Sequence, residues 1–299
     1  MYEENQGAVD SLVHLYVDGA FSRRELVRRV AKHTGSIGAA LAFLRGYDVF
    51  AQAATPCPAD IRVPEGVPDL ITRDVTYPGE DSQVFGYLAY PKAAQDSNLP
   101  GVIVIHENRG LVDHIKDVTR RAARAGFVAL GVDLLSRQGG TGQFTDPVQQ
   151  TAAYNKTTQD ERRADLIASL DYLKHLPYAR FDRIGAVGFC AGGGNVWDLA
   201  VNLPELAAAV AFYGAPPPVD QIPNLRAPFL GLYAQLDPNT TGRMPAVITA
   251  MLGAQKKFGL TIYEGVGHAF HNDTGPAYDA TAACDAWTRT IAWFNKFLA

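Results

Sequence analysis

One short stretch constrains this chain more than any other: an apolar strand that runs directly into a cysteine flanked by glycines. Residues 183–194 read RIGAVGFCAGGG, so Gly188 and Gly192 stand at i−2 and i+2 from Cys190, and a helix is expected to follow. A residue at the tip of a sharp strand-to-helix turn leaves little space for neighbouring side chains, which favours glycine on both sides. The pattern predicts a nucleophile elbow; a buried structural cysteine beside a glycine-rich turn is the alternative for this motif alone.

Two later strands each lead into a residue that could activate a thiol. An apolar strand at 228–236 ends at Asp237, and a short strand at 260–263 is followed by a glycine-rich loop that carries His268. All three residues follow predicted strands, as a site at the carboxyl edge of a parallel sheet requires. Taken singly, Asp237 could be a solvated carboxylate and His268 a surface histidine. Together with the elbow they predict a Cys190–His268–Asp237 triad.

A further apolar strand, residues 101–107, ends in His106-Glu107-Asn108-Arg109-Gly110. Four features together resemble the dienelactone hydrolase family: this strand ending, the elbow at Cys190, Asp237 after a later strand, and the Gly-His-x-Phe loop that carries His268. The resemblance covers about residues 70–299. Within that family the chain is similar to a bacterial subgroup with an N-terminal helical extension. The resemblance implies an α/β-hydrolase fold, with a mostly parallel central sheet, helices on both faces and an added N-terminal helical arm. It also implies a hydrolase that cleaves a small ester or lactone.

The residue types indicate how such a reaction would proceed. His268 would accept the thiol proton of Cys190 or pair with its thiolate, and Asp237 would orient the imidazole. The sulfur would attack the carbonyl carbon to form a thioacyl-enzyme intermediate. Backbone N–H groups of Ala191 and Asn108 would form the oxyanion hole.

The role of Glu107 and the identity of the substrate are less constrained. By the family resemblance Glu107 helps to activate the cysteine; the alternative is a structural ion pair with Arg109 or another arginine. The resemblance also implies that arginines hold the substrate carboxylate, and Asn272 stands where one of them is expected. A neutral or differently charged small ester is therefore as plausible as dienelactone. The candidate substrate-binding residues are Arg109, Tyr213, His271 and Asn272.

Residues 1–66 differ in character from the rest and are expected to form a helical extension followed by a proline-rich linker, with the catalytic domain at 67–299. Helices are expected at 2–17 and 22–44, with Ser22 as a cap. Residues 22–26, SRREL, resemble a twin-arginine export signal, although later charges interrupt the apolar region. A retained arm in a cytoplasmic enzyme, which could form a homodimer, and a periplasmic precursor are the two alternatives.

Composition narrows the classes of partner and cofactor. The net charge of −4 is spread along 299 residues, so neither a nucleic-acid nor a membrane partner is indicated, and the substrate is expected to be a small molecule. The three cysteines show no paired or metal-ligand spacing, so a disulfide framework, a metal site and a cofactor are not expected, and a reducing compartment is favoured. The rival functions are a general short-chain carboxylesterase, a thioesterase or acyltransferase, and a binding protein without activity.

The remaining elements can be placed from turn signals and periodicity. An antiparallel hairpin is expected from strands at 71–77 and 83–90, at the sheet edge. A helix at 113–125 and a strand at 127–133 complete a βαβ unit. The segment 134–159 is expected to be a long loop, either a binding loop or an ordinary surface excursion. Further helices are expected at 160–175, 244–257 and 279–298, and a strand at 207–213.

Overall fold

The computed structural model describes residues 9, 23–37, 40 and 61–299. The chain divides into two compact units, Met1–Thr55 with Gly259–Thr261 and Pro56–Phe258 with Ile262–Ala299. The helix expected at 2–17, the cap at Ser22 and the linker prolines before residue 61 lie outside the described residues. The proposed division into an arm at 1–66 and a catalytic domain at 67–299 therefore stays a prediction.

In the first unit, the described residues contain the helix α2 (Arg23–Thr34). Glu25 in its first turn pairs with Arg28 at 3.2 Å and with Arg29 at 2.9 Å. Ion pairs at these spacings support a helix from within. Leu26 and Val30, four residues apart, are fully buried. The helix predicted over 22–44 is thus confirmed from Arg23 to Thr34.

The second unit is built on one sheet with the strand order β1-β2-β4-β3-β5-β6-β7-β8. The predicted edge hairpin is confirmed: β1 and β2 pair antiparallel, and β2 joins β4 antiparallel. The pairs β3–β4, β3–β5, β5–β6 and β6–β7 are parallel. The strands are β1 (Leu70–Pro78), β2 (Gln83–Pro91), β3 (Leu99–Ile105), β4 (Val128–Asp133), β5 (Ala179–Phe189), β6 (Ala208–Phe212), β7 (Phe229–Ala234) and β8 (Phe258–Tyr263).

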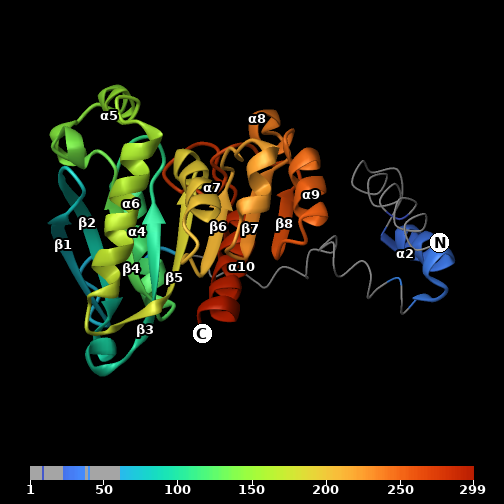
Figure 1. Ribbon diagram of the computed structural model, residues 1–299, viewed down its shortest axis with the longest axis horizontal. Helices are drawn as coiled ribbons and strands as arrows, with labels where there is room; N and C mark the ends of the chain where they lie inside the picture. The colour runs from blue at the N-terminus through green and yellow to red at the C-terminus, as the bar shows by residue number, and fades with distance from the viewer. Residues whose placement is uncertain (1–8, 10–22, 38–39, 41–60) are drawn as a thin grey trace. The chain divides into compact units, whose positions relative to one another are not determined.

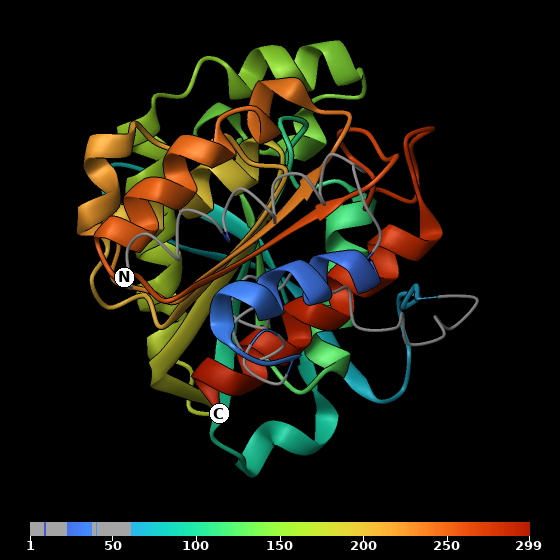
Figure 2. The ribbon, with the colours of Figure 1, turned by 90° about the vertical axis from the view of Figure 1, so that its right-hand side faces the viewer.

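Helices cover both faces of this sheet, as expected for the predicted fold class (Figure 1). Figure 2 turns the view by 90° and shows α10 on one side of the strands and α9 on the other. The helices are α4 (Asp113–Arg124), α5 (Pro147–Tyr154), α6 (Gln159–Lys174), α7 (Ala191–Asn202), α8 (Pro238–Thr241), α9 (Met244–Gly253) and α10 (Ala280–Leu298), with short 3-10 turns η1 (Lys92–Asp96), η2 (Ser136–Gln138), η3 (Thr141–Gln143) and η4 (Val219–Asn224).

The central strands are buried on both faces, which explains why their sequences are continuous apolar runs. Ile103 and Val104 in β3, Val187 in β5 and Phe212 in β6 have no exposed surface. Complete burial of one such side chain contributes about 1.5–3 kcal/mol. The sheet is therefore a rigid base for the loops that follow the strands.

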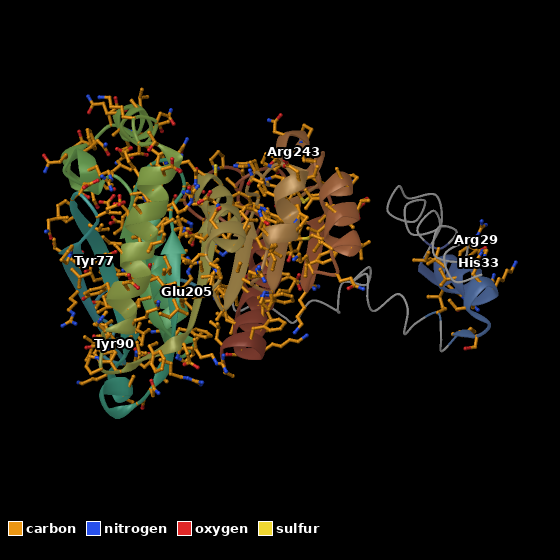
Figure 3. The ribbon with its side chains drawn as sticks, in the orientation of Figure 1. Arg29, His33, Tyr77, Tyr90, Glu205 and Arg243 are labelled. Atoms are coloured by element: carbon orange, nitrogen blue, oxygen red, sulfur yellow. The ribbon has the colours of Figure 1, made fainter. Side chains whose placement is uncertain are left out.

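Stacked tyrosines fix the edge hairpin to the rest of the sheet. Tyr77 stacks on Tyr172 of α6 with ring centroids 4.4 Å apart, and Tyr90 stacks on Tyr178 at 4.3 Å; Tyr77 and Tyr90 are labelled in Figure 3. The Tyr77 hydroxyl also forms a hydrogen bond of 2.7 Å with Ser169. Aromatic pairs add about 0.5–1.5 kcal/mol beyond their buried area, so the hairpin is an integral edge of the unit.

The segment between β4 and α6 is more ordered than the loop that the sequence suggested. It contains η2, η3 and α5, and Asp146 caps α5 by accepting a hydrogen bond of 2.9 Å from the Val148 N–H. Pro147 occupies the first helical position, so the Asp-Pro pair is a start signal that could have predicted this helix. Tyr154, at the end of α5, lines the cavity described below.

Candidate active site

The turn after β5 has the strained geometry that the flanking glycines predicted. Cys190 adopts φ 54° and ψ −114°, a backbone conformation that residues other than glycine rarely adopt. A Cβ atom on Gly188 would overlap the carbonyl of Gly192, and one on Gly192 would overlap the carbonyl oxygens of Ile105 and His106. Close packing of the elbow against the end of β3 therefore requires both glycines.

Cys190 lies directly before α7 and is half-buried. Its N–H donates to the carbonyl of Phe212 at 3.1 Å, which ties the turn to β6. The N-terminus of α7 supplies partial positive charge next to the sulfur.

His268 and Asp237 are brought together by the loops after β8 and β7. His268 Nδ1 lies 2.6 Å from Asp237 Oδ2, and the His268 side chain is 40% exposed. The pKa of His268 is raised to about 9, and the interaction with the Cys190 side chain is the largest cause. Burial lowers this pKa, whereas the hydrogen bond to Asp237 raises it further. His268 thus contacts Asp237 directly, and the Cys190 side chain acts on the pKa of the same imidazole.

Asp237 is held by a partner that sequence reasoning missed. Thr240 Oγ1 donates to Asp237 Oδ2 at 2.6 Å, and the aspartate is 4% exposed. Burial raises the pKa of Asp237, but the hydrogen bonds from Thr240 and His268 outweigh it and leave the pKa below its usual value. A hydroxyl three residues after an aspartate at a helix start is a recognisable local pattern that could have identified Thr240.

Glu107 lies at the end of β3 and is 9% exposed. Its Oε2 atom accepts a hydrogen bond of 2.9 Å from the side-chain amide of Asn272, while Oε1 has no partner. Among residues 61–299, Glu107 forms no ion pair with Arg109 or any other arginine within 4 Å. Asn272 therefore contacts Glu107, and it is not part of the cavity wall beside Cys190.

His106 and Thr141 anchor the loop that carries Asn108. His106 accepts from the Leu134 N–H at 2.9 Å through Nε2, and its Nδ1 lies against the carbonyl of Glu107, so it is a structural residue. Thr141 Oγ1 accepts from the Leu111 N–H at 2.8 Å. These bonds fix both ends of residues 106–111.

A cavity of about 870 Å³ opens beside Cys190, Ala191, Tyr213 and His268. Its wall includes Arg162, which sequence reasoning missed because the residue lies in an ordinary charged helix. The other lining residues are Tyr154, Gln159, Arg163, Gly194, Asn195, Trp197, Asp198, Asn202, Ala215, Pro216, Pro217, Pro218, Gln221, Asn224 and Thr240.

Besides Asn272, two more of the candidate substrate-binding residues lie away from this cavity wall. His271 is fully buried, and its ring stacks on Phe189 with centroids 4.9 Å apart. Burial lowers the pKa of His271 well below its usual value. Arg109 is half-buried in the loop after β3 and does not line the cavity. Of the four candidates, Tyr213 alone contributes to the wall beside Cys190.

A buried ion cluster stabilises the loop that follows His268. Asp273, whose side chain is 5% exposed, contacts Arg121 at 2.7 Å, Arg62 at 2.8 Å and His114 at 3.0 Å. Burial raises the pKa of Asp273, but these partners outweigh burial and hold the pKa far below its usual range. Arg62 was expected to lie in the linker, but its ion pair with Asp273 ties it to the second unit.

We expect Asp273→Asn to lower the free energy of unfolding at pH 7 by about 2 kcal/mol, because the buried Arg121 loses one of its two carboxylates and keeps only Asp117. The contribution of Asp273 is present above its unfolded pKa of about 4 and is lost as the pH falls towards the depressed folded value. Urea unfolding at pH 7, 5 and 3 should therefore show a difference between the two proteins that shrinks with acidity. Asp74→Asn is the matched control, since Asp74 pairs with Lys116 but is 78% exposed, and its effect should stay below about 1 kcal/mol. Equal effects of both substitutions would contradict the role of the cluster.

One cysteine differs from the sequence-based expectation that no disulfide forms. Cys284 is buried and disulfide-bonded, and its partner lies outside the described residues. Spacing along the chain does not predict which cysteines approach each other in space. Cys190 is a free thiol. Within the described residues, no three His, Cys, Asp or Glu side chains are grouped to hold a metal ion, and no helix meets the length and hydropathy needed to span a membrane.

The sheet, its helices and the sharp strand-to-helix turn at Cys190 define the class of protein: it has an α/β-hydrolase fold. Residues 84–298 match the model of the Dienelactone hydrolase family. A relative in Methylorubrum extorquens named "Putative carboxymethylenebutenolidase" is 34% identical over 264 residues, which covers 83% of this chain and 89% of the relative. The chain therefore belongs to the dienelactone hydrolase family, and it is a hydrolase.

Solved structures agree with this assignment. A crystal structure from Klebsiella pneumoniae, described as a "Putative Dienelactone Hydrolase", has a TM-score of 0.70 and 32% identity, and the match covers 76% of this chain and 99% of that one. A dienelactone hydrolase-like promiscuous phosphotriesterase from metagenomic libraries has a TM-score of 0.67 and 26% identity, with coverage of 77% and 100%.

Proposed function

We propose that this hydrolase cleaves a small ester or lactone through a Cys190–His268–Asp237 triad and a thioacyl-enzyme intermediate. The observation that carries the proposal is the connected arrangement of these residues. Cys190 stands on a strained turn and raises the pKa of His268, which contacts Asp237 at 2.6 Å, and Cys190 and His268 both line a cavity of about 870 Å³. A small molecule fits a cavity of this size.

The steps start from a protonated His268, because its pKa is raised to about 9. The Cys190 thiolate attacks the carbonyl carbon, while the Asp237 carboxylate stabilises the charged imidazole of His268. When the tetrahedral intermediate collapses, His268 gives its proton to the leaving alkoxide, and the acyl group remains on sulfur. Neutral His268 then removes a proton from water, which attacks the thioester, and the acid leaves as Cys190 is regenerated.

The oxyanion is assigned to the N–H groups of Ala191 and Asn108. Supporting this, α7 begins at Ala191, so the Ala191 N–H belongs to the unpaired first turn of a helix. The close approach of Gly192 to the carbonyls of Ile105 and His106 brings the elbow next to the loop that carries Asn108. Preorganised donors of this kind typically contribute 10²–10³ in rate each.

For the substrate class, we propose that the ester or lactone carries a negative charge that Arg162 contacts. Arg162 donates to the Thr157 carbonyl at 2.6 Å, to the Thr157 hydroxyl at 2.8 Å and to Gln159 Oε1 at 3.0 Å, and its Nε has no partner. Among residues 61–299 no carboxylate lies within 4 Å of Arg162. Its neighbour Arg163, by contrast, is paired with Asp198 and Asp160. An arginine left without an acid in a cavity wall is suited to an anionic ligand.

A panel of p-nitrophenyl esters and lactones tests both parts of the proposal. The wild-type protein should hydrolyse them, and it should prefer esters with a carboxylate on the acyl chain, such as the hemisuccinate, over neutral esters of equal length. In Arg162→Gln the ratio of kcat/KM for the anionic to the neutral ester should fall about tenfold or more, whereas Arg162→Lys should retain part of it. An unchanged ratio would remove the anionic substrate class and leave the ester hydrolase.

The panel also separates the rival functions. A thioesterase would prefer acyl thioesters over the corresponding esters, and an acyltransferase would pass the acyl group to an added amine or alcohol instead of water. A general short-chain carboxylesterase would hydrolyse the neutral esters without a preference for charge. A binding protein without activity would release no nitrophenol from any of them.

Assembly and compartment are separate proposals. We propose that the N-terminal arm is retained and mediates a homodimer; deletion of residues 1–60 should then shift the elution volume without loss of esterase activity. The truncation ends at residue 60 because Arg62 and Val63 are bonded to the catalytic unit. For the compartment, the retained arm corresponds to the cytoplasm. The periplasm is the alternative; the disulfide at Cys284 would suit it, and it would require removal of the arm. A mature N-terminus near Ala54 in cells would support export.

A further inference from the structure

The buried polar atoms without a hydrogen-bond partner include the hydroxyl of Tyr213 and Oε1 of Glu107. An unpaired buried polar atom costs about 1–3 kcal/mol. Phenylalanine at position 213 would fill the same space without the cost of the hydroxyl. An unpaired phenol in the wall of an active-site cavity is therefore a candidate for a functional role.

The position of Tyr213 is set by its backbone and by ring packing. Tyr213 follows β6 directly, has a left-handed φ of 38° and donates its N–H to the carbonyl of Leu232 at 2.8 Å. Its ring is fully buried, with its centroid 4.8 Å from that of His268 and 5.4 Å from that of Phe270. The hydroxyl is thus held in place, and any partner must move to it.

Glu107 is the matching partner, because its Oε1 is a buried acceptor without a donor, whereas the Tyr213 hydroxyl is a buried donor without an acceptor. Burial is the largest cause that raises the pKa of Tyr213 well above its usual value, and the charges of Glu107 and Cys190 raise it further. The hydroxyl therefore keeps its hydrogen in the presence of both groups. Glu107 has a longer, rotatable side chain that is fixed through Oε2 alone, by Asn272.

We propose that Tyr213 is a positioning residue whose hydroxyl donates a hydrogen bond to Oε1 of Glu107 when the Cys190 thiol ionises and so completes, with Asn272 on Oε2, a two-donor support for this carboxylate. A rotation of the Glu107 carboxylate would satisfy both unpaired atoms at once. A carboxylate held by two donors has its charge partly compensated and repels the nearby Cys190 thiolate less. This inference rests on the proposed function, since it concerns the thiolate of the same site.

Other ionisable groups face the same site and must stay constant in a test. They come from the loops after β8, β7 and β3 and from the helices α5, α6 and α7, and they are His268, Asp237, His106, Tyr154, Arg162, Arg163 and Asp198. None is altered in the variants below. A change in thiol reactivity in these variants therefore reports on Tyr213 and Glu107.

The test is the pH dependence of Cys190 alkylation by iodoacetamide in the substrate-free full-length protein. In Tyr213→Phe, the midpoint should move to higher pH and the rate at pH 7 should fall about tenfold, because the Glu107 charge acts on the thiolate without its second donor. In a Glu107→Gln background the same Tyr213→Phe change should have no effect, because there is no carboxylate to support. A Tyr213→Phe rate within twofold of wild type would overturn the proposal, and so would an equal loss in both backgrounds.

Tyr233→Phe provides a matched control. The Tyr233 hydroxyl is equally buried, but it donates to the Gly214 carbonyl at 3.0 Å and accepts from Trp197 Nε1 at 2.9 Å, and it does not line the cavity. Tyr233→Phe should lower the urea unfolding midpoint and leave the alkylation profile unchanged. Tyr213→Phe should show the opposite pattern, with an equal or higher midpoint and slower alkylation. A lower unfolding midpoint in Tyr213→Phe would mean that its hydroxyl has a structural partner and would overturn the assignment.

The readout separates this inference from the proposed function. Alkylation requires no substrate, so a protein that hydrolyses none of the panel esters can still show the coupling between Tyr213 and Glu107. Conversely, efficient hydrolysis with no coupling would reject the role of Tyr213 and retain the triad.

Discussion

Replacement of Cys190 by alanine should lower kcat for the best ester of the panel by about 10⁴-fold or more, because the attacking atom is lost. The fold should persist, since the half-buried thiol fills little volume and alanine meets the same backbone strain at φ 54°. The free energy of unfolding should therefore change by no more than about 1 kcal/mol. Stopped-flow release of nitrophenol should also lose its burst phase, the signature of the thioacyl intermediate.

Two companion measurements make this result specific to the thiolate. Cys190→Ser should be far slower than the wild type, because a hydroxyl is much less acidic than a thiol. Iodoacetamide should modify Cys190 ahead of Cys284, which is buried and disulfide-bonded. A serine variant as active as the wild type, or full activity after alkylation of Cys190, would contradict thiolate chemistry.

The second large effect is expected at the triad acid. Asp237→Asn should lower kcat by about 10³–10⁴-fold, because the amide favours the wrong imidazole tautomer and no longer stabilises the charged ring. Thr240→Val removes the donor that holds Asp237 at 2.6 Å and should cost about tenfold or less, since the carboxylate itself remains. Equal losses in the two variants would mean that Asp237 acts only as part of the local structure.

The pH profile of kcat/KM gives an independent check of the same pair. With the pKa of His268 raised to about 9, the imidazole keeps its proton through neutral pH and loses it as the pH rises through that value. Activity in the wild type should therefore fall on an alkaline limb near pH 9, where the proton for the leaving group disappears. In Asp237→Asn this limb should move towards the ordinary value of about 6.5. A limb that stays in place would show that Asp237 does not contribute to the basicity of His268.

Much of the site was predictable because its residues are marked by local sequence. Gly188 and Gly192 predicted the elbow at Cys190, since a strained turn against β3 excludes side chains wherever it occurs. Asp237 and His268 were found because each follows an apolar strand, and parallel strands deliver their carboxyl ends to one edge of the sheet. The edge hairpin was predictable from its turn residues for the same reason, because its contacts are close in sequence.

Other features depend on contacts between residues far apart in sequence. Asn272 was expected to line the pocket, but it donates to Glu107, which lies 165 residues earlier in the chain. Arg162 looks like any surface residue of a charged helix, and only its place in the cavity wall without an acid partner distinguishes it. The unpaired hydroxyl of Tyr213 likewise has no signature in sequence. Burial, charge compensation and hydrogen-bond satisfaction depend on which groups meet in three dimensions, so they emerge only when the strands and helices pack together.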